Sequence, residues 1–359
     1  MSSGRKILFI GSFPKKVKGG TSTATSSLLN SAVFKGENIT TIDSTLKSIR
    51  HNYMLGRMWR ALKRFIRLHS MLSNNRPDVA LIFFGHGWGF IEKGFYTIYL
   101  RLWGIRSVIA PRSGILLNNL KHRFYEFWLR RVFKRASFIL CQGNYWQTIY
   151  SNYVAKDKLK VVFNWIRLPD EKVDCEAKRP GPVKLLFMGW YEEYKGVGTI
   201  LKVARELAQQ GEKFELHMYG EGSLRKDMES FVLEHGLEKT VFIHGWINGE
   251  EKKEAFLSSN VLLQASTVEG MPNVILEAMS YGLPVIANGI SSIPEVVQHK
   301  TTGILYFRQD QKDLAQQIKS LIHNPSLCKY ISKNARKWIE DEHQVEEAAQ
   351  HIMSLLYQI

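Results

Sequence analysis

Short apolar runs alternate with longer helical patterns along this chain, and this alternation constrains the fold more than any other feature. A glycine or a polar turn follows most of the runs. The alternation is typical of parallel sheets with helices on both faces, and we therefore predict an α/β fold. The runs that we expect as strands are residues 6–10, 79–84, 108–110, 137–141, 160–162, 184–188, 214–219, 241–244, 261–263 and 285–287.

The length of the chain predicts more than one domain. A chain of 359 residues suits two domains of ordinary size, each large enough for its own core. Residues 169–182 contain three prolines and charges of both signs, which is typical of a linker. We therefore expect one domain over residues 1–168 and a second over residues 169–340.

Two glutamates eight positions apart mark residues 266–295. Glu269 lies in an expected loop, and Glu277 lies on the helix predicted for residues 273–281. Free amides at a helix start favour an anion such as phosphate, and carboxylates accept hydrogen bonds from sugar hydroxyls. The stretch therefore suits a nucleotide sugar. Spacing alone also fits an ordinary strand-loop-helix unit whose two carboxylates are merely solvated.

The residues after this helix add two motifs, G-L-P-V at 282–285 and P-E-V-V at 294–297. With the glutamate pair, they resemble the retaining glycosyltransferases of family 4, and the resemblance runs from about residue 184 to 335. It implies a GT-B fold, in which two Rossmann-like domains turn their parallel sheets toward an interdomain cleft. It also implies a last helix, about residues 341–359, that packs back on the first domain.

The resemblance implies a hexosyltransferase and names its site residues. Glu269 and Lys195 are the expected catalytic residues, with Lys195 neutralising the donor diphosphate. The arginine that the family carries in the loop before this lysine is replaced here by Trp190. The residues expected to bind the donor are Glu277, Gly270, Met271, Pro272, Asn273, Gly20, Trp246, Ile247 and Trp190.

The first domain offers candidates for the acceptor or for phosphate. Arg112 stands where many family members carry a histidine, His86 lies in a glycine-rich turn, and Lys15 lies in the first-strand loop with Gly20. Each has a structural alternative, because glycine turns, loop lysines and loop histidines are common without any ligand.

The two halves of the chain carry net charges of opposite sign. Residues 1–168 hold 28 Lys and Arg against 6 Asp and Glu, a net charge of +22, within a total of +16, so the remaining residues carry −6. A field of one sign favours a polyanionic partner. Residues 46–72 combine seven basic residues with apolar residues at helical spacing, which indicates docking on an anionic membrane or a basic outer face of a core helix. The basic residues are Lys47, Arg50, Arg57, Arg60, Lys63, Arg64 and Arg67.

These observations lead to one functional expectation and its rivals. We expect sugar transfer from a nucleoside-diphosphate sugar, with UDP favoured over GDP, to a lipid-linked saccharide in bacterial surface polysaccharide synthesis. The rivals are a nucleotide-sugar epimerase or hydrolase of the same fold, and a non-catalytic nucleotide-sugar-binding protein whose basic domain holds membrane or nucleic acid. Nucleic acid is not the favoured partner.

The expected setting is the cytoplasmic face of the cell membrane. The apolar run at residues 7–10 is too short for a signal peptide, and three cysteines without a C-x-x-C pair indicate a reducing compartment. No residues have the spacing of metal ligands, so we expect neither a metal nor another cofactor.

Overall fold

The computed structural model describes residues 4–13, 19–45, 54–172, 181–307 and 310–359. The chain divides into two compact units, of which unit 1 comprises Met1–Trp165 with Val345–Ile359 and unit 2 comprises Ile166–Gln344. The change from one unit to the other therefore lies close to the boundary that we expected after residue 168. Among the described residues, no helix is both long enough and apolar enough to cross a membrane.

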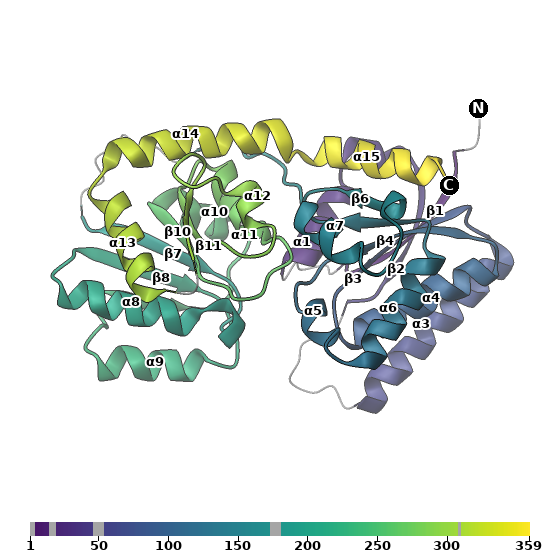
Figure 1. Ribbon diagram of the computed structural model, residues 1–359, viewed down its shortest axis with the longest axis horizontal. Helices are drawn as coiled ribbons and strands as arrows, with labels where there is room; N and C mark the ends of the chain where they lie inside the picture. Colours follow the sequence, from purple (N-terminus) through teal and green to yellow (C-terminus); the bar gives the residue numbers. More distant parts are fainter. Residues whose placement is uncertain (1–3, 14–18, 46–53, 173–180, 308–309) are drawn as a thin grey trace. The chain divides into compact units, whose positions relative to one another are not determined.

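Unit 1 is built on a six-stranded sheet in the order β2-β1-β3-β4-β5-β6, in which all neighbouring strands are parallel (Figure 1). The order reverses between β1 and β3, and in open sheets of this kind ligands bind beyond the carboxyl ends of the strands at such a switch point. The strands are β1 (Lys6–Gly11), β2 (Asn38–Asp43), β3 (Val79–Phe84), β4 (Arg106–Pro111), β5 (Phe138–Cys141) and β6 (Leu159–Val161). The helices are α1 (Gly20–Leu29), α2 (Ala32–Lys35), α3 (Met54–Asn74), α4 (Trp88–Leu102), α5 (Leu116–Asn119), α6 (Arg123–Arg135), α7 (Asn144–Tyr150), the 3-10 turn η2 (Lys156–Lys158) and α15 (Val345–Tyr357).

Both faces of this sheet are covered, which explains why its central strand is apolar throughout. All six residues of β3 are buried. Its alternate residues Ala80, Ile82 and Phe84 join a cluster that includes residues of α3, α4 and α6. Val79, Leu81 and Phe83 join a second cluster with α1 and with α15, whose Ile352 and Leu356 are fully buried. The last helix of the chain thus completes the core of unit 1.

Unit 2 repeats the architecture with the strand order β12-β11-β10-β7-β8-β9, again with all neighbours parallel. Its order reverses between β7 and β10. The strands are β7 (Val183–Met188), β8 (Phe214–Tyr219), β9 (Val241–His244), β10 (Val261–Gln264), β11 (Val285–Asn288) and β12 (Ile304–Tyr306). The helices are the 3-10 turn η3 (Glu193–Lys195), α8 (Val197–Gln209), α9 (Arg225–Glu234), α10 (Glu250–Ser258), α11 (Asn273–Ser280), α12 (Ile293–Val296), α13 (Gln311–Ile322) and α14 (Pro325–Glu342).

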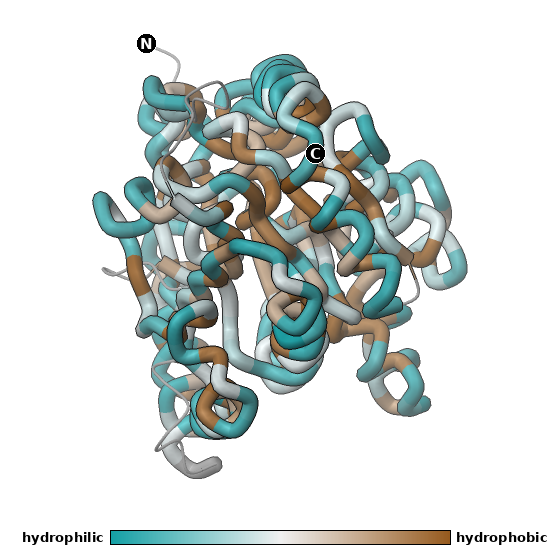
Figure 2. The backbone as a smooth tube through the Cα atoms, turned by 90° about the vertical axis from the view of Figure 1, so that its left-hand side faces the viewer, coloured by the Kyte–Doolittle hydropathy of each residue, from teal (hydrophilic) through white to brown (hydrophobic). Residues whose placement is uncertain are grey.

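The helices of unit 2 are amphipathic and bury one stripe each. In α8 the buried residues Val197, Ile200, Leu201, Ala204 and Leu207 recur every three or four positions, so they share one side of the helix. Hydrophobic segments in Figure 2 accordingly alternate with hydrophilic ones along the chain. This packing holds the loops at the carboxyl ends of β7 and β10, from which the candidate site is built.

Candidate active site

Lys195 and Glu269 meet at the switch point of the unit 2 sheet. Lys195 ends the turn η3 after β7, and Glu269 lies in the loop after β10. The ammonium nitrogen Nζ of Lys195 lies 2.6 Å from Oε1 of Glu269, and only 17% and 10% of the two side chains are exposed. Gln264, the last residue of β10, donates a second hydrogen bond to the same oxygen at 2.9 Å. The pair predicted to be catalytic is therefore in direct contact and partly shielded from water.

Gly196 allows this close approach of the two loops. Its φ of +71° is left-handed, and a Cβ atom at this position would lie 2.2 Å from the carbonyl oxygen of Ala265. Any other residue would therefore clash with the β10 loop. The backbone N–H of Thr267 donates to the carbonyl oxygen of Tyr194 at 2.8 Å, which fastens the loops side by side.

The residues between the two glutamates form a buried turn. The carbonyl oxygen of Gly270 accepts hydrogen bonds from the hydroxyls of Ser292, at 2.7 Å, and Ser291, at 3.2 Å. Met271 is buried, and Pro272 caps α11 without a side chain that could accept from the first-turn amides. Asn273 opens the helix. The amides of this first turn are the kind of group that binds phosphate at a helix start.

Glu277 is held by a lysine that the sequence did not single out. It lies on α11, and its Oε2 atom is 2.6 Å from Nζ of Lys252 on α10. The carboxylate is 12% exposed and the lysine 29%, so the pair is shielded but open to solvent on one side. The lysine fixes the orientation of the carboxylate.

Trp190 and Trp246 form an aromatic pair beside these loops. A single glycine separates Trp190 from the end of β7, and another separates Trp246 from the end of β9. Their ring centroids lie 5.0 Å apart with the planes inclined by 40°. Ile247, another residue expected to bind the donor, is half-buried next to Trp246. Two predicted donor residues from separate strands are thus brought into contact.

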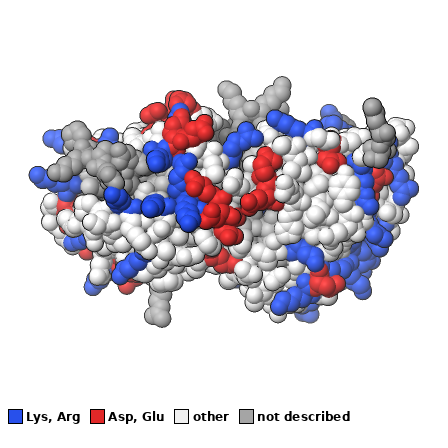
Figure 3. Space-filling view, turned by 90° about the horizontal axis from the view of Figure 1, so that it is seen from above, with Lys and Arg blue, Asp and Glu red and all other residues white. Residues whose placement is uncertain are grey.

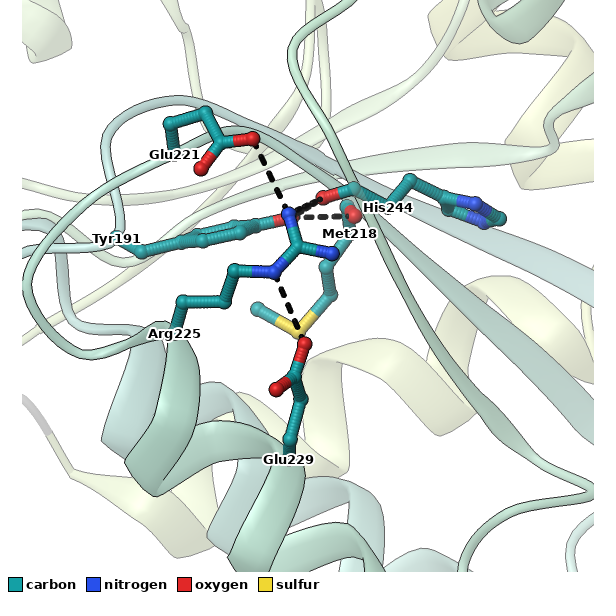
Figure 4. A network of polar contacts seen from close by, with 6 residues as sticks. All are labelled: Tyr191, Met218, Glu221, Arg225, Glu229 and His244. Carbon is teal, nitrogen blue, oxygen red and sulfur yellow. Dashed lines mark hydrogen bonds and ion pairs between the residues drawn. The ribbon is translucent and has the colours of Figure 1, made fainter.

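Tyr191 anchors the loop that carries Trp190 (Figure 4). Its ring is fully buried, and its hydroxyl lies within donating distance of two carbonyl oxygens, that of Met218 at 2.6 Å and that of His244 at 2.8 Å. These carbonyls stand at or near the ends of β8 and β9. Because the pKa of Tyr191 is raised, mainly by burial, the phenol keeps its proton and can act as the donor.

Arg225 fastens the same strand ends from α9. Its guanidinium pairs with Glu229 at 2.9 Å and with Glu221 at 3.2 Å, and Nη1 also donates to the carbonyl oxygen of His244 at 3.3 Å (Figure 4). Together with Tyr191, it ties the backbone just before Trp246 to the rest of the unit. The aromatic pair therefore rests on a hydrogen-bonded support.

Arg112 is the most distinctive candidate in unit 1. It follows β4, is 8% exposed, and its guanidinium carbon lies 4.8 Å from the ring centroid of Trp165 and 5.2 Å from that of Phe83. Burial lowers the pKa of Arg112 to about 9, so the side chain is still charged at neutral pH. No acidic side chain of the described residues forms an ion pair with it. It is a buried cation that packs against two aromatic rings.

The described residues among the other unit 1 candidates follow β1 and β3 in the chain. His86 is exposed, and its Nδ1 lies 2.9 Å from the hydroxyl oxygen of Ser113, the residue after Arg112. Gly20 is the first residue of α1. Lys15 lies outside the described residues, as do Lys47 and Arg50 of the basic set.

One residue of that basic set, Arg64, was wrongly predicted to face a membrane. Its Nε donates to Oε1 of Glu92 on α4 at 2.7 Å, and the side chains are only 13% and 5% exposed. The charge is neutralised inside unit 1, so it is not available to a lipid surface.

Comparison with known proteins indicates what kind of domain contains Lys195 and Glu269. Residues 170–338 match the family model described as glycosyl transferases group 1. The match covers just under half of the chain, and this part is similar to that family. The glycosyltransferase domain includes both glutamates, Lys195, Lys252 and the two tryptophans, and it confirms the sequence-based prediction of a glycosyltransferase domain.

Two relatives show how far the sequence similarity extends. The chain is 28% identical over 204 residues to an uncharacterized 41.2 kDa protein in the cps region of Klebsiella pneumoniae; the match covers 55% of each chain, so this chain spans about half the length of that relative. It is also 28% identical over 322 residues to the amylovoran biosynthesis glycosyltransferase AmsK of Erwinia amylovora, covering 87% of this chain and 77% of AmsK.

Similarity of fold extends beyond the glycosyltransferase domain. The crystal structure of HepE from Anabaena, solved in complex with UDP-glucose, matches 99% of this chain and 100% of its own, with a TM-score of 0.77 at 18% identity. At this identity the match shows the fold alone. With the two parallel six-stranded sheets, it confirms the predicted two-domain α/β class, GT-B.

Several features around the glycosyltransferase domain's carboxylates were not foreseen. Lys252 lies in a run of charged residues, E-E-K-K-E, that reads as a solvated helix face, and Gln264 reads as an ordinary strand end. Nothing in the local sequence marks either one.

Within the described ranges, no group of three or more His, Cys, Asp and Glu side chains could hold a metal ion.

Proposed function

We propose that this protein is a retaining hexosyltransferase that moves a sugar from a UDP-sugar to a hydroxyl of a saccharide acceptor in bacterial surface polysaccharide synthesis. The contact between Lys195 and Glu269 at the switch point carries this proposal, because it places a cation and a carboxylate where such sheets bind ligands. AmsK, named for amylovoran biosynthesis, supports a polysaccharide product, and HepE, solved with UDP-glucose, supports the UDP-sugar donor.

The donor would lie across the loops of unit 2. Glu277, oriented by Lys252, would accept hydrogen bonds from the ribose hydroxyls, and Glu269 with the residue 270–273 turn would contact the sugar. Lys195 would form an ion pair with the donor diphosphate as well as with Glu269. The Trp190 and Trp246 rings offer an apolar surface for the base. We expect no metal to be required.

The chemistry follows from the family resemblance. The bond from the anomeric carbon to the leaving phosphate breaks as the acceptor oxygen bonds to the same carbon on the same face, and the leaving phosphate takes the acceptor proton. No covalent enzyme intermediate is needed, so the protein contributes positioning and stabilisation of the charge that develops on the phosphate. Lys195 is the residue of unit 2 that supplies this charge.

Unit 1 would supply the acceptor side of the reaction. Arg112 is a buried cation that a phosphate or another anion would neutralise, and His86 presents a ring beside Ser113. We propose that these side chains bind the acceptor or its phosphate, which suits a lipid-linked saccharide carrying a diphosphate.

The surface of α3 supports docking of unit 1 on an anionic membrane. Trp59 and Ile66 are 58% and 57% exposed, and Lys63 and Arg67 are exposed beside them. On α6, Phe124 and Phe127 are also exposed among basic residues. Apolar side chains interleaved with cations are typical of helices that lie in a membrane interface, where each cation near the surface contributes about 1 kcal/mol. We therefore propose a peripheral position on the inner face of the cell membrane.

One experiment tests the transfer reaction. The purified protein is incubated with UDP-, GDP- and ADP-sugars, with and without an anionic bacterial lipid extract, and release of nucleoside diphosphate is measured. We expect release from a UDP-sugar only when the lipid extract is present, and we expect it to vanish in Glu277→Ala but not in Glu234→Ala, an exposed glutamate on α9. Release of free sugar or an epimer without an acceptor would favour the hydrolase or epimerase. Nucleotide binding without release from any donor would favour the non-catalytic protein.

A second experiment tests the membrane surface. Flotation with phosphatidylglycerol vesicles and with phosphatidylcholine vesicles should show binding to the anionic vesicles alone, lost in the Trp59→Ala, Ile66→Ala double variant. Leu233→Ala, which removes an exposed apolar side chain of unit 2, should bind normally. Salt-dependent retention on DNA without vesicle binding would overturn the membrane proposal.

A further inference from the structure

Unit 1 contains a pocket that the proposed reaction does not use. Its volume is about 310 Å³, and it is lined by the amino ends of β4 and β5, the last residues of α4 and α6, the turn η2 and Ile359. Five of its nine lining residues are basic. They are Arg101, Arg106, Lys134, Arg135 and Lys158.

The charge of this pocket is not neutralised within the described chain. None of the lining side chains is acidic, and none of the five cations forms an ion pair with a described residue. The terminal carboxyl group of Ile359 also lines the pocket, but it is engaged by Arg5, whose Nη1 lies 2.5 Å from its oxygen. Asp157 is the nearby acid, and it is the sequence neighbour of Lys158. Lys and Arg side chains likewise gather at the right-hand edge of Figure 3, on unit 1.

Lys158 gives the pocket a fixed cation. Its ammonium donates to the backbone carbonyl oxygens of Lys134 at 3.0 Å and Ala136 at 2.9 Å, where α6 ends. Two of its three N–H groups are thereby used, and one remains for a ligand. The pKa of Lys158 is lowered by burial and by the repulsion of Arg101 and Lys134, against the attraction of Asp157. A bound anion would relieve this repulsion.

The pocket is at the opposite end of the sheet from the candidate acceptor residues. Arg106 begins β4, whereas Arg112 follows its last residue, Pro111. Six strand residues at about 3.3 Å each separate the two ends by roughly 20 Å. Because ligands of the reaction bind at the carboxyl ends of such strands, the pocket is a separate site.

We propose that this pocket binds a phosphate-bearing anion. Two kinds of hydrogen-bond donor line the pocket. Guanidinium groups bind two phosphate oxygens at once, and ammonium groups act as point charges. Its volume exceeds that of a single phosphate and accommodates a diphosphate or a phosphorylated head group. The ligand is either a soluble phosphate compound or the phosphate of a membrane lipid. This proposal does not depend on the transfer reaction.

Protection of lysines from acetylation tests the site directly, because it reports on single residues. The full chain is treated with an amine-reactive acetylating ester and analysed by peptide mass spectrometry, alone, with pyrophosphate, with phosphatidate vesicles and with phosphatidylcholine vesicles. We expect pyrophosphate to reduce the acetylation of Lys134 at least threefold and to leave Lys121, an exposed lysine of the same unit, unchanged.

The arms of the experiment separate the two sources of phosphate. Protection by pyrophosphate identifies a soluble ligand, and protection by phosphatidate vesicles alone identifies a lipid phosphate. Equal acetylation of Lys134 in all four samples would overturn the proposal. The Arg106→Gln variant should lose the protection of Lys134, whereas Arg131→Gln, on the same helix α6 but outside the pocket lining, should keep it. Protection that persists in Arg106→Gln would also contradict the site.

Discussion

Lys195 and Glu269 touch through Nζ and Oε1 at 2.6 Å, although 74 residues separate them in the chain. The strand order of unit 2 explains the contact, because β7 and β10 are neighbours in the sheet and each side chain lies in the loop after one of them. A partly buried ion pair of this kind holds both side chains in a fixed orientation before a substrate arrives. The donor phosphate would then contact Lys195, and the donor sugar would contact Glu269, without any rearrangement of the two side chains.

We expect Lys195→Met to lower kcat for donor cleavage by at least about 100-fold, because removing one preorganised group that stabilises developing charge has an effect of this size. Steady-state kinetics with the identified donor would measure it. Lys202→Met on α8 changes an exposed lysine of the same unit and should leave kcat unchanged. A kcat within threefold of wild type would exclude Lys195 from the charge-stabilising role.

Lys252→Met should raise the KM for the donor about tenfold while changing kcat little, because it releases Glu277 from its fixed orientation without touching the leaving group. Its sequence neighbour provides a matched control. Lys253 pairs with Glu171 and Glu250 instead, so Lys253→Met should leave the KM unchanged. Equal effects of the two substitutions would show that general loss of charge, and not the orientation of Glu277, is responsible.

Trp190→Ala should weaken the binding of UDP by about 5- to 150-fold, since stacking of a base on an aromatic ring contributes about 1–3 kcal/mol. Quenching of tryptophan fluorescence by UDP, or calorimetry, would give the affinity. Trp246→Ala should have a similar effect, because the two rings lie in contact. If both variants bound UDP as tightly as wild type, the base would lie elsewhere.

Tyr191→Phe should reduce the free energy of unfolding of unit 2 by about 1–3 kcal/mol, because buried backbone carbonyls of Met218 and His244 lose a shared donor. Urea unfolding followed by circular dichroism would detect it. Tyr330→Phe removes the hydroxyl of an exposed tyrosine of the same unit and should be neutral. An unchanged midpoint for Tyr191→Phe would mean that other donors, such as Arg225 at the His244 carbonyl, satisfy these oxygens without the tyrosine.

Unit 2 should lose stability as the pH falls through the usual histidine range. Burial, His217 and Arg225 lower the pKa of His244 in the folded protein, so the unfolded chain takes up a proton that the folded chain resists. The loss should begin near the unfolded value of about 6.5 and stop below the folded pKa. Urea midpoints at pH 7.5 and 5.5 should differ less in His244→Asn than in His351→Asn, which alters an exposed histidine.

Local sequence was enough to predict the elements and the loop positions of the site. The alternating runs predicted parallel sheets, and the spacing of Glu269 and Glu277 placed one in a loop and the other on a helix, as the structure has them. Helix α15 (Val345–Tyr357) lies within the range of about residues 341–359 that was expected for the last helix. These features depend on residues close together in the chain, which is why patterns of spacing could reveal them.

Partners across the sheet could not be predicted, because they depend on strand order. The contact of Lys252 with Glu277 joins two helices, and that of Trp190 with Trp246 joins two loops. The separation of these segments becomes known only once β7, β9 and β10 have their places in the sheet. Arg64 was misread for a related reason. It lies four residues before Leu68 and therefore on the buried side of α3, but a charged residue there is acceptable only because Glu92 on another helix neutralises it.

The position of α15 in the core of unit 1 has a consequence during synthesis. A ribosome adds about 5–20 residues per second. The apolar sheet face formed by Ile7, Phe9 and Phe83 must therefore wait roughly 10 to 40 seconds after Trp165 is made before helix α15 exists to cover it. Unit 2 can acquire its own core in that interval. Unit 1, although it begins first, is the part of the chain that finishes folding last.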